Sequence, residues 1–353
     1  SIYIKKKIEI SKKMSSIRNN EIKDLSFLND LSKEQKSAVV YNDSPQLVLS
    51  GAGSGKTKVL TSKIAYLIKA LDIPPYNILA ITFTKKAAKE MRDRISRLIG
   101  GEYSKKINMG TFHSIFLKIL RENISFLKHK KYKSNFQIVD ESEVKKILKN
   151  ILLEQFSDVL NEIFQKKNIN DKVKSYLELK NLIHRITKKI MCLKCEGITY
   201  KDYQKMEKEI ENDEKRGMAF FKSIYRAYVK ECIRKNVMDF EDLIINTLYL
   251  FKENARILEK YQKKFKYILI DEYQDTNRTQ YEIIKALAWK SHKICGVGDD
   301  YQSIYSFRGS DIKNIDNFSK AFKDSKIFKL CQNYRSNSTI VKIADLLIKN
   351  NQS

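Results

Sequence analysis

Residues 50–57 read SGAGSGKT, a spacing of glycine, lysine and threonine that is suited to holding a phosphate. Gly55, Lys56 and Thr57 match the pattern GxxxxGK[ST], while Ser50 takes the first glycine position. The glycines let the backbone curl so that N–H groups face a phosphate, and a following helix adds the positive end of its dipole. Lys56 would neutralise the β- and γ-phosphates of a nucleoside triphosphate, and Thr57 would ligate Mg²⁺.

The sequence around this loop favours a nucleotide site over a glycine-rich turn that binds nothing. QLVLS at 46–50 predicts a short buried strand before the loop, and a helix is expected from about Lys56 to Ala70. Strand, loop and helix in this order are the context that the phosphate-loop motif requires. The predicted nucleotide-binding residues of the loop are Ser50, Gly51, Ala52, Gly53, Ser54, Gly55, Lys56, Thr57 and Lys58.

A second candidate for chemistry is the acidic stretch YILIDEYQDT at 267–276. An apolar strand is predicted to end in Asp271 and Glu272. An aspartate at a strand end beside a phosphate loop can hold Mg²⁺, and a glutamate next to it can accept a proton from the attacking water. Taken alone, the stretch would be a solvated acidic turn. Its pairing with a phosphate loop favours the catalytic interpretation.

The elements that must position these residues indicate an α/β domain with a parallel sheet. A further strand is predicted at ILAIT (78–82), followed by the helical stretch KKAAKEMRDRISRLI. Later apolar runs, each followed by a loop rich in Gly, Asp or Asn, add strands at YILI (267–270), ICGVG (294–298) and KIFKL (326–330). Repeated strand–loop–helix units are typical of this fold class.

The middle of the chain has a different pattern. From about 118 to 218 there is no proline and little strand pattern, and apolar residues recur at helical spacing, as in Leu148, Ile151 and Leu152. A structureless loop between Lys56 and Asp271 would be implausibly long. We therefore predict a helical insertion within the α/β domain.

Composition gives weaker information about partners. The net charge of +26 is consistent with a nucleic-acid partner, but the excess of basic residues is spread along the chain, so a lysine-rich composition explains it equally well. No apolar run approaches the roughly 20 residues of a membrane span, and the basic start, SIYIKKKIEISKKM, lacks the apolar run of a secretory signal. Residues 1–13 are expected to be an N-terminal extension.

Five cysteines in a chain of 353 residues suggest a reducing compartment, and we expect a cytoplasmic location. Cys192 and Cys195 form one CxxC motif, and His184 is the nearest histidine in sequence. A lone CxxC is a weak indication of zinc, so two ordinary cysteines on a helix are the better interpretation.

Taken together, the motifs resemble the UvrD/Rep/PcrA family of superfamily 1 DNA helicases, from about Leu31 to the end of the chain. LSKEQ (31–35) is similar to a family segment whose glutamine reads adenine, which implies this role for Gln35. NYRS (333–336) is similar to the motif that carries an arginine finger, which implies catalysis by Arg335 and adenine stacking by Tyr334. Arginine suits this role because its planar fork grips a phosphate at two points.

Other motifs resemble the family's DNA contacts. ITFTKKAAKEM (81–91) and GTFHS (110–114) are similar to its DNA-contacting motifs, and VGDDYQSIYSFRGSD (297–311) to the motif that couples nucleotide to DNA. DFEDLI (239–244) matches a further family stretch. The resemblance implies that Gln302 senses the γ-phosphate. It implies DNA contacts by Phe83, Thr84, Thr111, His113, Tyr305 and Phe307.

The residues themselves leave two roles open for these aromatics. Phe83, Tyr305 and Phe307 lie in polar, turn-rich surroundings, where aromatic rings can stack on bases without selecting a sequence. Packing in the core is the commoner role of a single phenylalanine. The chain also departs from the family, which usually has tryptophan at Phe307 and aspartate at Tyr301.

The resemblance implies a RecA-like P-loop NTPase domain, 1A, formed by residues 14–117 and 219–345, and a helical insertion, 1B, at 118–218. It implies an ATP-dependent 3′→5′ DNA helicase with ATP and Mg²⁺ as cofactors. Lys56, Glu272, Gln302 and Arg335 would be catalytic, and Thr57 and Asp271 would hold the metal. The DNA would be single-stranded or partly duplex.

A second motor domain is expected to follow this chain, and we expect the 353 residues alone not to separate strands. Three alternatives remain. They are a nuclease–helicase subunit of the RecB/AddA kind, a phosphate-loop ATPase that is not coupled to DNA, and a non-catalytic nucleic-acid-binding module. The Asp271–Glu272 pair disfavours the last of these.

Overall fold

The fold is known from a computed structural model, which describes residues 24–51, 55–128, 131–167, 171–206, 212–299 and 314–330. These residues form two compact units. The first contains the described residues up to Phe112, then Glu259–Thr276, and those from Lys285 onward. The second contains His113–Leu258 and Asn277–Ile284.

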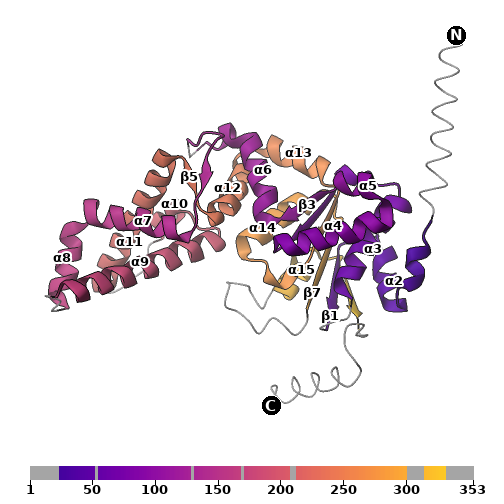
Figure 1. The fold of residues 1–353 in the computed structure, drawn as a ribbon, viewed down its shortest axis with the longest axis horizontal. Helices are drawn as coiled ribbons and strands as arrows, with labels where there is room; N and C mark the ends of the chain where they lie inside the picture. Colours follow the sequence, from indigo (N-terminus) through magenta and orange to yellow (C-terminus); the bar gives the residue numbers. More distant parts are fainter. Residues whose placement is uncertain are drawn as a thin grey trace, which may run out of the picture. The chain divides into compact units, whose positions relative to one another are not determined.

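The first unit is built on a sheet of six strands. They lie in the order β3-β2-β6-β7-β1-β8, and every pairing between neighbours is parallel (Figure 1). The strands are β1 (Gln46–Ser50), β2 (Ile78–Thr82), β3 (Asn108–Thr111), β6 (Tyr267–Ile270), β7 (Ile294–Asp299) and β8 (Lys326–Leu330). This confirms the predicted α/β fold with a parallel sheet.

The central strands are apolar because both faces of the sheet are covered. All residues of β1 and β2 are buried, which is the pattern of a strand inside a parallel sheet. Helices accompany the strands, joined in places by the 3₁₀ turns η1 (Ser26–Asp30), η2 (Pro75–Asn77) and η4 (Tyr273–Asp275). These helices are α2 (Lys33–Val40), α3 (Lys56–Lys69), α4 (Lys85–Ile99), α5 (Gly101–Lys105) and α15 (Asn314–Ala321).

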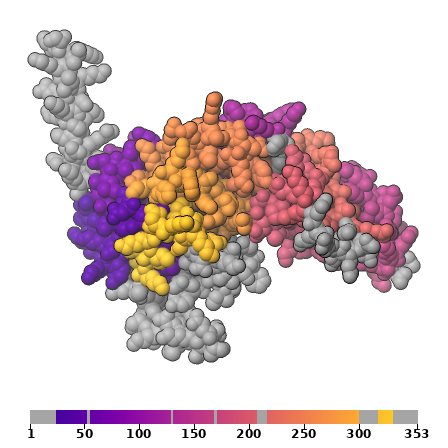
Figure 2. Space-filling model, turned by 180° about the vertical axis from the view of Figure 1, so that it is seen from behind, coloured from indigo at the N-terminus to yellow at the C-terminus, as the bar shows by residue number. Residues whose placement is uncertain are grey.

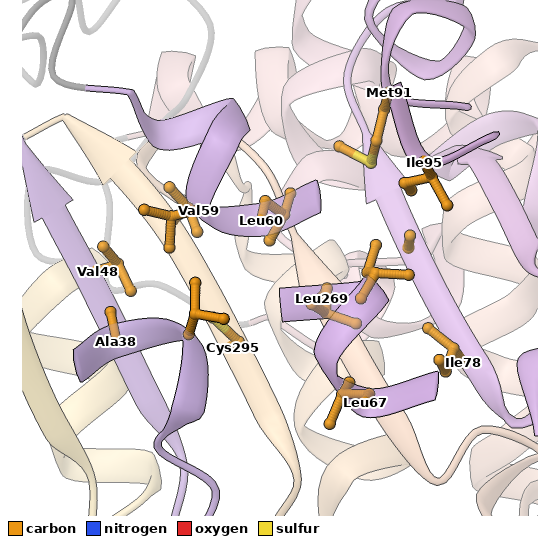
Figure 3. Close-up of a cluster of buried hydrophobic side chains, with 14 of the residues drawn as sticks. Ala38, Val48, Val59, Leu60, Leu67, Ile78, Met91, Ile95, Leu269 and Cys295 are labelled. Carbon is orange, nitrogen blue, oxygen red and sulfur yellow. The ribbon is translucent and has the colours of Figure 1, made fainter. Parts of the chain in front are cut away.

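One face of the sheet carries the core shown in Figure 3. Val59 and Leu60 of α3 pack against alternate residues of the strands, among them Val48 and Leu269, and Ala38 of α2 joins the same cluster. Alternate strand residues point to one face, so this pattern fixes which face α2, α3 and α4 cover. Because α3 begins directly after Gly55, the core also fixes the position of this end of the phosphate loop.

β8 lies at one end of the sheet and pairs only with β1 among the described strands. Residues 314–330, in yellow, lie on the surface in Figure 2, and Ile327 is an exposed large apolar side chain. Most residues of β8 are exposed or half-buried, whereas every residue of β1 is buried, as expected for a strand at the margin of a sheet.

The second unit is almost entirely helical. Its elements are α6 (Phe112–Asn123), η3 (Ile124–Phe126), β4 (Gln137–Ile138), α7 (Glu141–Gln155), α8 (Ser157–Lys166), α9 (Lys172–Cys195), α10 (Tyr200–Lys205), α11 (Asn212–Lys235), β5 (Val237–Met238) and α12 (Phe240–Glu253). β4 and β5 form a short parallel pair. The helices α13 (Ala255–Lys264) and α14 (Arg278–Ala288) each have residues in both units.

The spatial grouping differs from the expected insertion at 118–218. The helical unit also contains residues 219–258, which we had expected to belong with the sheet. The reason is the apolar face of α11, since Ile224, Tyr225 and Tyr228 are buried in one cluster with residues of α7 and α9. The assignment of the two units as domains 1A and 1B stays a prediction.

A buried charge cluster ties the end of α9 to the start of α12. Lys194 Nζ pairs with Asp239 Oδ2, and it lies 2.9 Å from Asp242 Oδ1, with all three side chains at most 3% exposed. Asp239 caps α12, and the Asp242 side chain completes the capping box. Tyr228 donates a further hydrogen bond to Asp239 Oδ2, at 2.7 Å. The DFEDLI stretch therefore has a structural role in this unit.

The two cysteines of the CxxC motif have different surroundings. Cys192 is exposed, whereas the Sγ of Cys195 donates to Glu241 Oε2 at 3.5 Å. Among the described residues, no group of three or more His, Cys, Asp or Glu side chains could hold a metal ion. In addition, none of the helices in the described ranges is both long and apolar enough to cross a membrane.

Replacing Lys194 with methionine should strongly destabilise the helical unit. The change leaves two buried carboxylates without their counter-ion, which costs about 3–5 kcal/mol. Unfolding by urea, followed through circular dichroism, measures the loss. Lys180→Met on the exposed side of α9 is the matched control and should change stability by less than about 0.5 kcal/mol. Equal effects of the two substitutions would contradict the structural role of the cluster.

Candidate functional site

The carboxyl edge of the parallel sheet gathers most of the described residues that the sequence singled out. Ser50 lies in register with Asp299, and Thr82 with Thr111. Strand β6 lies between β2 and β7, so Asp271 follows at the same edge. In open α/β sheets, ligands bind in the crevice outside the carboxyl ends of the strands. The sheet topology thus places the loop and the acidic motif at one location.

The described ends of the phosphate loop show how it approaches α3. Gly55 has φ 85°, a left-handed conformation that favours glycine, and it is the N-cap of α3. A Cβ atom at Gly55 would lie 2.5 Å from Nε2 of Gln35, so a larger residue here would displace the Gln35 carboxamide. Gln35 is buried, and its side chain accepts the Ser32 backbone N–H in the capping box of α2. The adenine-reading candidate therefore lies against the loop.

Lys56 joins the loop to the acidic motif. Its Nζ donates to Glu272 Oε2 at 3.2 Å and lies 2.8 Å from Asp299 Oδ1. The contact with Asp299 is ionic and lacks the geometry of a hydrogen bond. The Lys56 side chain is 12% exposed, so solvent screens these pairs less than it screens surface pairs. The structure thus places the predicted lysine and the predicted glutamate together.

Glu272 is held in an unusual backbone conformation. It has φ 48° and ψ 47°, the left-handed region that non-glycine residues rarely adopt, directly before the 3₁₀ turn η4. Its Oε2 also accepts a hydrogen bond from Gln274 Nε2 at 2.6 Å. Strained residues of this kind cluster at functional sites. The Glu272 side chain is 37% exposed, so water can reach it.

Asp271 is the more buried of the two acidic residues. Its Oδ1 accepts the backbone N–H of Glu272 at 3.0 Å, and its own N–H donates to Ile81 O on β2. Burial, with a smaller contribution from the Glu272 charge, raises the pKa of the Asp271 carboxyl to about 6. A bound cation would favour the ionised form.

Two residues of this site were missed by sequence reasoning. Asp299, at the end of β7, is 3% exposed and supplies the second carboxylate for Lys56. Gln274 connects the two acidic segments, because its Oε1 accepts the Asp299 N–H at 3.1 Å while its Nε2 donates to Glu272. A Cβ at Gly298 would lie 2.4 Å from Gln274 Oε1, so this bridge requires glycine. The available signal was an acidic residue directly after the apolar run ICGVG.

The predicted DNA contacts of the sheet unit lie at the same edge, with different surroundings. Phe83 is half-buried, and its ring packs edge-on against Phe112 at 5.2 Å between centroids. Thr84 is exposed, and its Oγ1 accepts the Ala87 N–H as the N-cap of α4. Thr111 is buried at the end of β3. Phe83 thus packs on Phe112 while part of the residue stays exposed, and its contact with DNA remains a prediction.

His113 belongs to the helical unit. Its ring packs edge-on against Phe240 at 5.6 Å, and its Nε2 is buried without a hydrogen-bond partner in the described part of the chain. Burial lowers the pKa of the His113 imidazole, so the ring is neutral at pH 7.

The remaining loop and metal candidates have local roles in α3. Thr57 is half-buried in the first turn, and its carbonyl accepts the Thr61 hydroxyl at 2.9 Å. Lys58 Nζ donates to the Asp30 carbonyl at 2.5 Å. The predicted residues that lie outside the described ranges are Ala52, Gly53, Ser54, Gln302, Tyr305, Phe307, Tyr334 and Arg335.

Comparison with known proteins agrees with this geometry. Residues 31–323 match the family model of the UvrD/REP helicase N-terminal domain. The chain is similar to the ATP-dependent DNA helicase PcrA of Staphylococcus aureus, at 40% identity over 92% of this chain and 40% of the relative. It is equally similar to PcrA of Staphylococcus epidermidis, at 40% identity over 92% of this chain and 41% of the relative.

The chain thus spans about two fifths of the length of the curated relatives it matches. The matched residues include the phosphate loop, the acidic motif and Asp299. They therefore contain Lys56 and both of its carboxylate partners. The chain therefore belongs to the UvrD/REP helicase family and contains the N-terminal domain of that family.

Proposed function

We propose that this chain is the N-terminal motor half of an ATP-dependent DNA helicase that translocates 3′→5′ on single-stranded DNA. The observation that carries the proposal is the Lys56–Glu272 ion pair, which brings the phosphate loop and the acidic motif together at one sheet edge. PcrA of Staphylococcus aureus, a relative, is named as an ATP-dependent DNA helicase. The polarity rests on the family resemblance alone.

In this proposal, Lys56 changes partners when ATP arrives. Without nucleotide, its ammonium neutralises Glu272 and Asp299. The β- and γ-phosphates carry more negative charge than a carboxylate and would draw the ammonium toward the loop. Glu272 then loses its counter-ion and can accept a proton from the attacking water, while the Gln274 amide keeps its carboxylate oriented.

The described residues fit a magnesium ion that is held mainly by the nucleotide. Mg²⁺ keeps several waters and uses one or two protein ligands together with substrate phosphates. Asp271 supplies a buried carboxylate at the sheet edge, and Thr57 supplies a hydroxyl in the first turn of α3. When bound, the ion would neutralise charge on the β- and γ-phosphates.

The nucleotide would be recognised at its base by Gln35 and Tyr334, and Gln302 and Arg335 would act at the γ-phosphate. The role of Gln35 is supported by the position of its Nε2, which lies where a Cβ atom on Gly55 would be in close contact. The other three rest on the resemblance, because they lie outside the described residues. The second motor domain is proposed as the partner that completes the ATP site, and a cytoplasmic location is proposed for the protein.

DNA contact is proposed along the carboxyl edge of the sheet. Phe83 presents a half-buried ring there, beside the exposed Thr84, and Thr111 ends the neighbouring strand. A partly buried ring on a fixed support can stack on a base at a low entropic cost. His113, Tyr305 and Phe307 are proposed as further contacts.

Replacing Glu272 with glutamine in the full-length protein should lower kcat for ATP hydrolysis by about 10²–10⁴-fold, because the amide cannot accept the proton of the attacking water. The affinity for ATP should be retained. Single-turnover hydrolysis and equilibrium binding of a fluorescent nucleotide measure the two quantities. Glu102→Gln, at an exposed position on α5, is the control. An unchanged kcat in Glu272→Gln would exclude the proposed role.

Replacing Asp271 with asparagine should stabilise the metal-free protein at neutral pH. The pKa of this carboxyl is raised from 3.8 to about 6 in the folded state, so its ionised form costs folding free energy above pH 6. Removing the charge should gain about 3 kcal/mol there. As the pH falls below 6 the folded carboxyl becomes protonated, so the gain shrinks, and it vanishes below about pH 4.

Thermal unfolding in the presence of EDTA, with and without the Asp271→Asn substitution, measures this gain between pH 4 and 8. Asp93→Asn, an exposed carboxylate on α4, is the control and should leave the melting temperature unchanged. A loss of stability in Asp271→Asn at pH 8 would contradict the electrostatic analysis. The same variant should also lose Mg²⁺-dependent hydrolysis.

A further inference from the structure

A buried lysine lies on the side of α3 that faces α2. Lys63 is 3% exposed, and its Nζ donates to the backbone carbonyls of Tyr41 at 2.5 Å, Val39 at 3.4 Å and Ala38 at 3.5 Å. Within the described ranges, no carboxylate lies at ion-pair distance from this ammonium. A lysine so deeply buried costs stability unless its charge is satisfied, so the three carbonyls must have a function in holding it.

These carbonyls belong to the C-terminal end of α2. The helix ends at Val40, and Tyr41 is its C-cap. The last carbonyls of a helix have no partner within the helix and carry the negative end of its dipole. Lys63 supplies both hydrogen bonds and positive charge at this point. Gln46 Nε2 adds a further bond to the Ala38 carbonyl at 2.9 Å. Figure 3 shows Ala38 in the cluster that joins α2 to α3 and the sheet.

The opposite end of α2 carries the residue that lies against the phosphate loop. Gln35 stands in the first turn, where its side chain completes the capping box with Ser32. Just before the helix, Lys58 Nζ donates to the Asp30 carbonyl. A helix of eight residues is about 12 Å long and behaves as a stiff rod. Two lysines of α3 therefore hold the two ends of the segment that presents Gln35.

We propose that Lys63 is a positioning residue for base recognition: its ammonium fixes α2 along α3 and so sets the place of the Gln35 carboxamide beside Gly55. The inference rests on the proposed function, in which Gln35 reads adenine. It assigns a task to a residue that contacts no part of the nucleotide. Loss of Lys63 would thus weaken binding of the base while leaving the phosphate loop intact.

The protonation of Lys63 gives the proposal a second readout. The pKa of the ammonium is lowered to about 8, mainly by burial; Cys295 opposes this shift and the Lys293 charge adds to it. Lys293 itself donates to the Asn42 carbonyl, and the Tyr267 hydroxyl accepts from Asn42 at 3.1 Å in the same region. Above pH 8 the neutral amine has two hydrogens and no charge for three carbonyls. The hydrogen bonds from Lys63 to the carbonyls of α2 therefore weaken, whereas an arginine at this position keeps its charge.

The test uses the full-length protein with Lys63→Met, Lys63→Arg and Gln35→Ala. Isothermal titration measures the binding of ADP and of inorganic tripolyphosphate, which lacks the base. Lys63→Met and Gln35→Ala should each weaken ADP binding about tenfold, which corresponds to the loss of one or two hydrogen bonds. Both variants should bind tripolyphosphate within about twofold of the unmodified protein. Lys63→Arg should restore ADP binding. The double variant should lose no more than either single change, because both remove the same contact.

Steady-state hydrolysis supplies a matched measurement. Lys63→Met should raise KM for ATP, leave kcat within about twofold, and reduce the preference for ATP over GTP. If Lys63→Met does not fold, the comparison of the unmodified protein with Lys63→Arg decides. Between pH 7 and 9 the unmodified protein should lose ADP affinity relative to tripolyphosphate, and Lys63→Arg should not.

Equal losses of ADP and tripolyphosphate in Lys63→Met, additive losses in the double variant, or parallel pH profiles would overturn the positioning role. Failure of the proposed function looks different. In that case the unmodified protein would bind neither ADP nor tripolyphosphate, and Lys56→Ala would change nothing.

Discussion

The ion pairs of Lys56 with Glu272 and Asp299 depend on a constraint of parallel sheets, namely that all carboxyl ends lie at one edge. Lys56 and Glu272 are more than 200 residues apart in the sequence. The strands next to the three residues, β1, β6 and β7, are nevertheless neighbours in the sheet. The helical unit can therefore occupy the chain between them without disturbing the site. The order of the strands therefore brings residues that are distant in the sequence into one site.

Three lysines in this molecule show how the surroundings decide what a buried cation does. Lys194 is fully enclosed by two carboxylates and acts as a structural link. Among the described residues, the hydrogen-bond partners of Lys63 are backbone carbonyls at the negative end of a helix. Lys56 also has carboxylate partners, but one of them, Glu272, is 37% exposed. In the proposed function, the phosphates of an incoming nucleotide compete with this carboxylate for the Lys56 ammonium. Exchange of partners is possible only for the last, which suits a residue that must respond to a ligand.

The sequence predicted most of the sheet and part of the site. The apolar runs at 46–50, 78–82, 267–270, 294–298 and 326–330 all form strands, because runs buried on both faces leave an unmistakable pattern. β3 was not predicted as a strand, since NMGT has only one large apolar residue. The motif residues Lys56, Asp271 and Glu272 were identified by type and spacing. Asp299, Gln274 and Lys63 were not, because their contacts depend on sheet order and helix packing, which local patterns do not encode.

The hydrogen bonds of Gln274 connect the two carboxylate residues that pair with Lys56. The Gln274 side chain accepts the Asp299 N–H on Oε1 and donates to Glu272 from Nε2, so it links the acidic motif to the end of β7. Gly298 allows this close approach. The residues that follow Asp299 in sequence include Gln302, Tyr305 and Phe307, which are proposed to sense the γ-phosphate and touch DNA. In the proposed function, a change at Lys56 on nucleotide binding would reach the end of β7 through Glu272 and the two hydrogen bonds of Gln274.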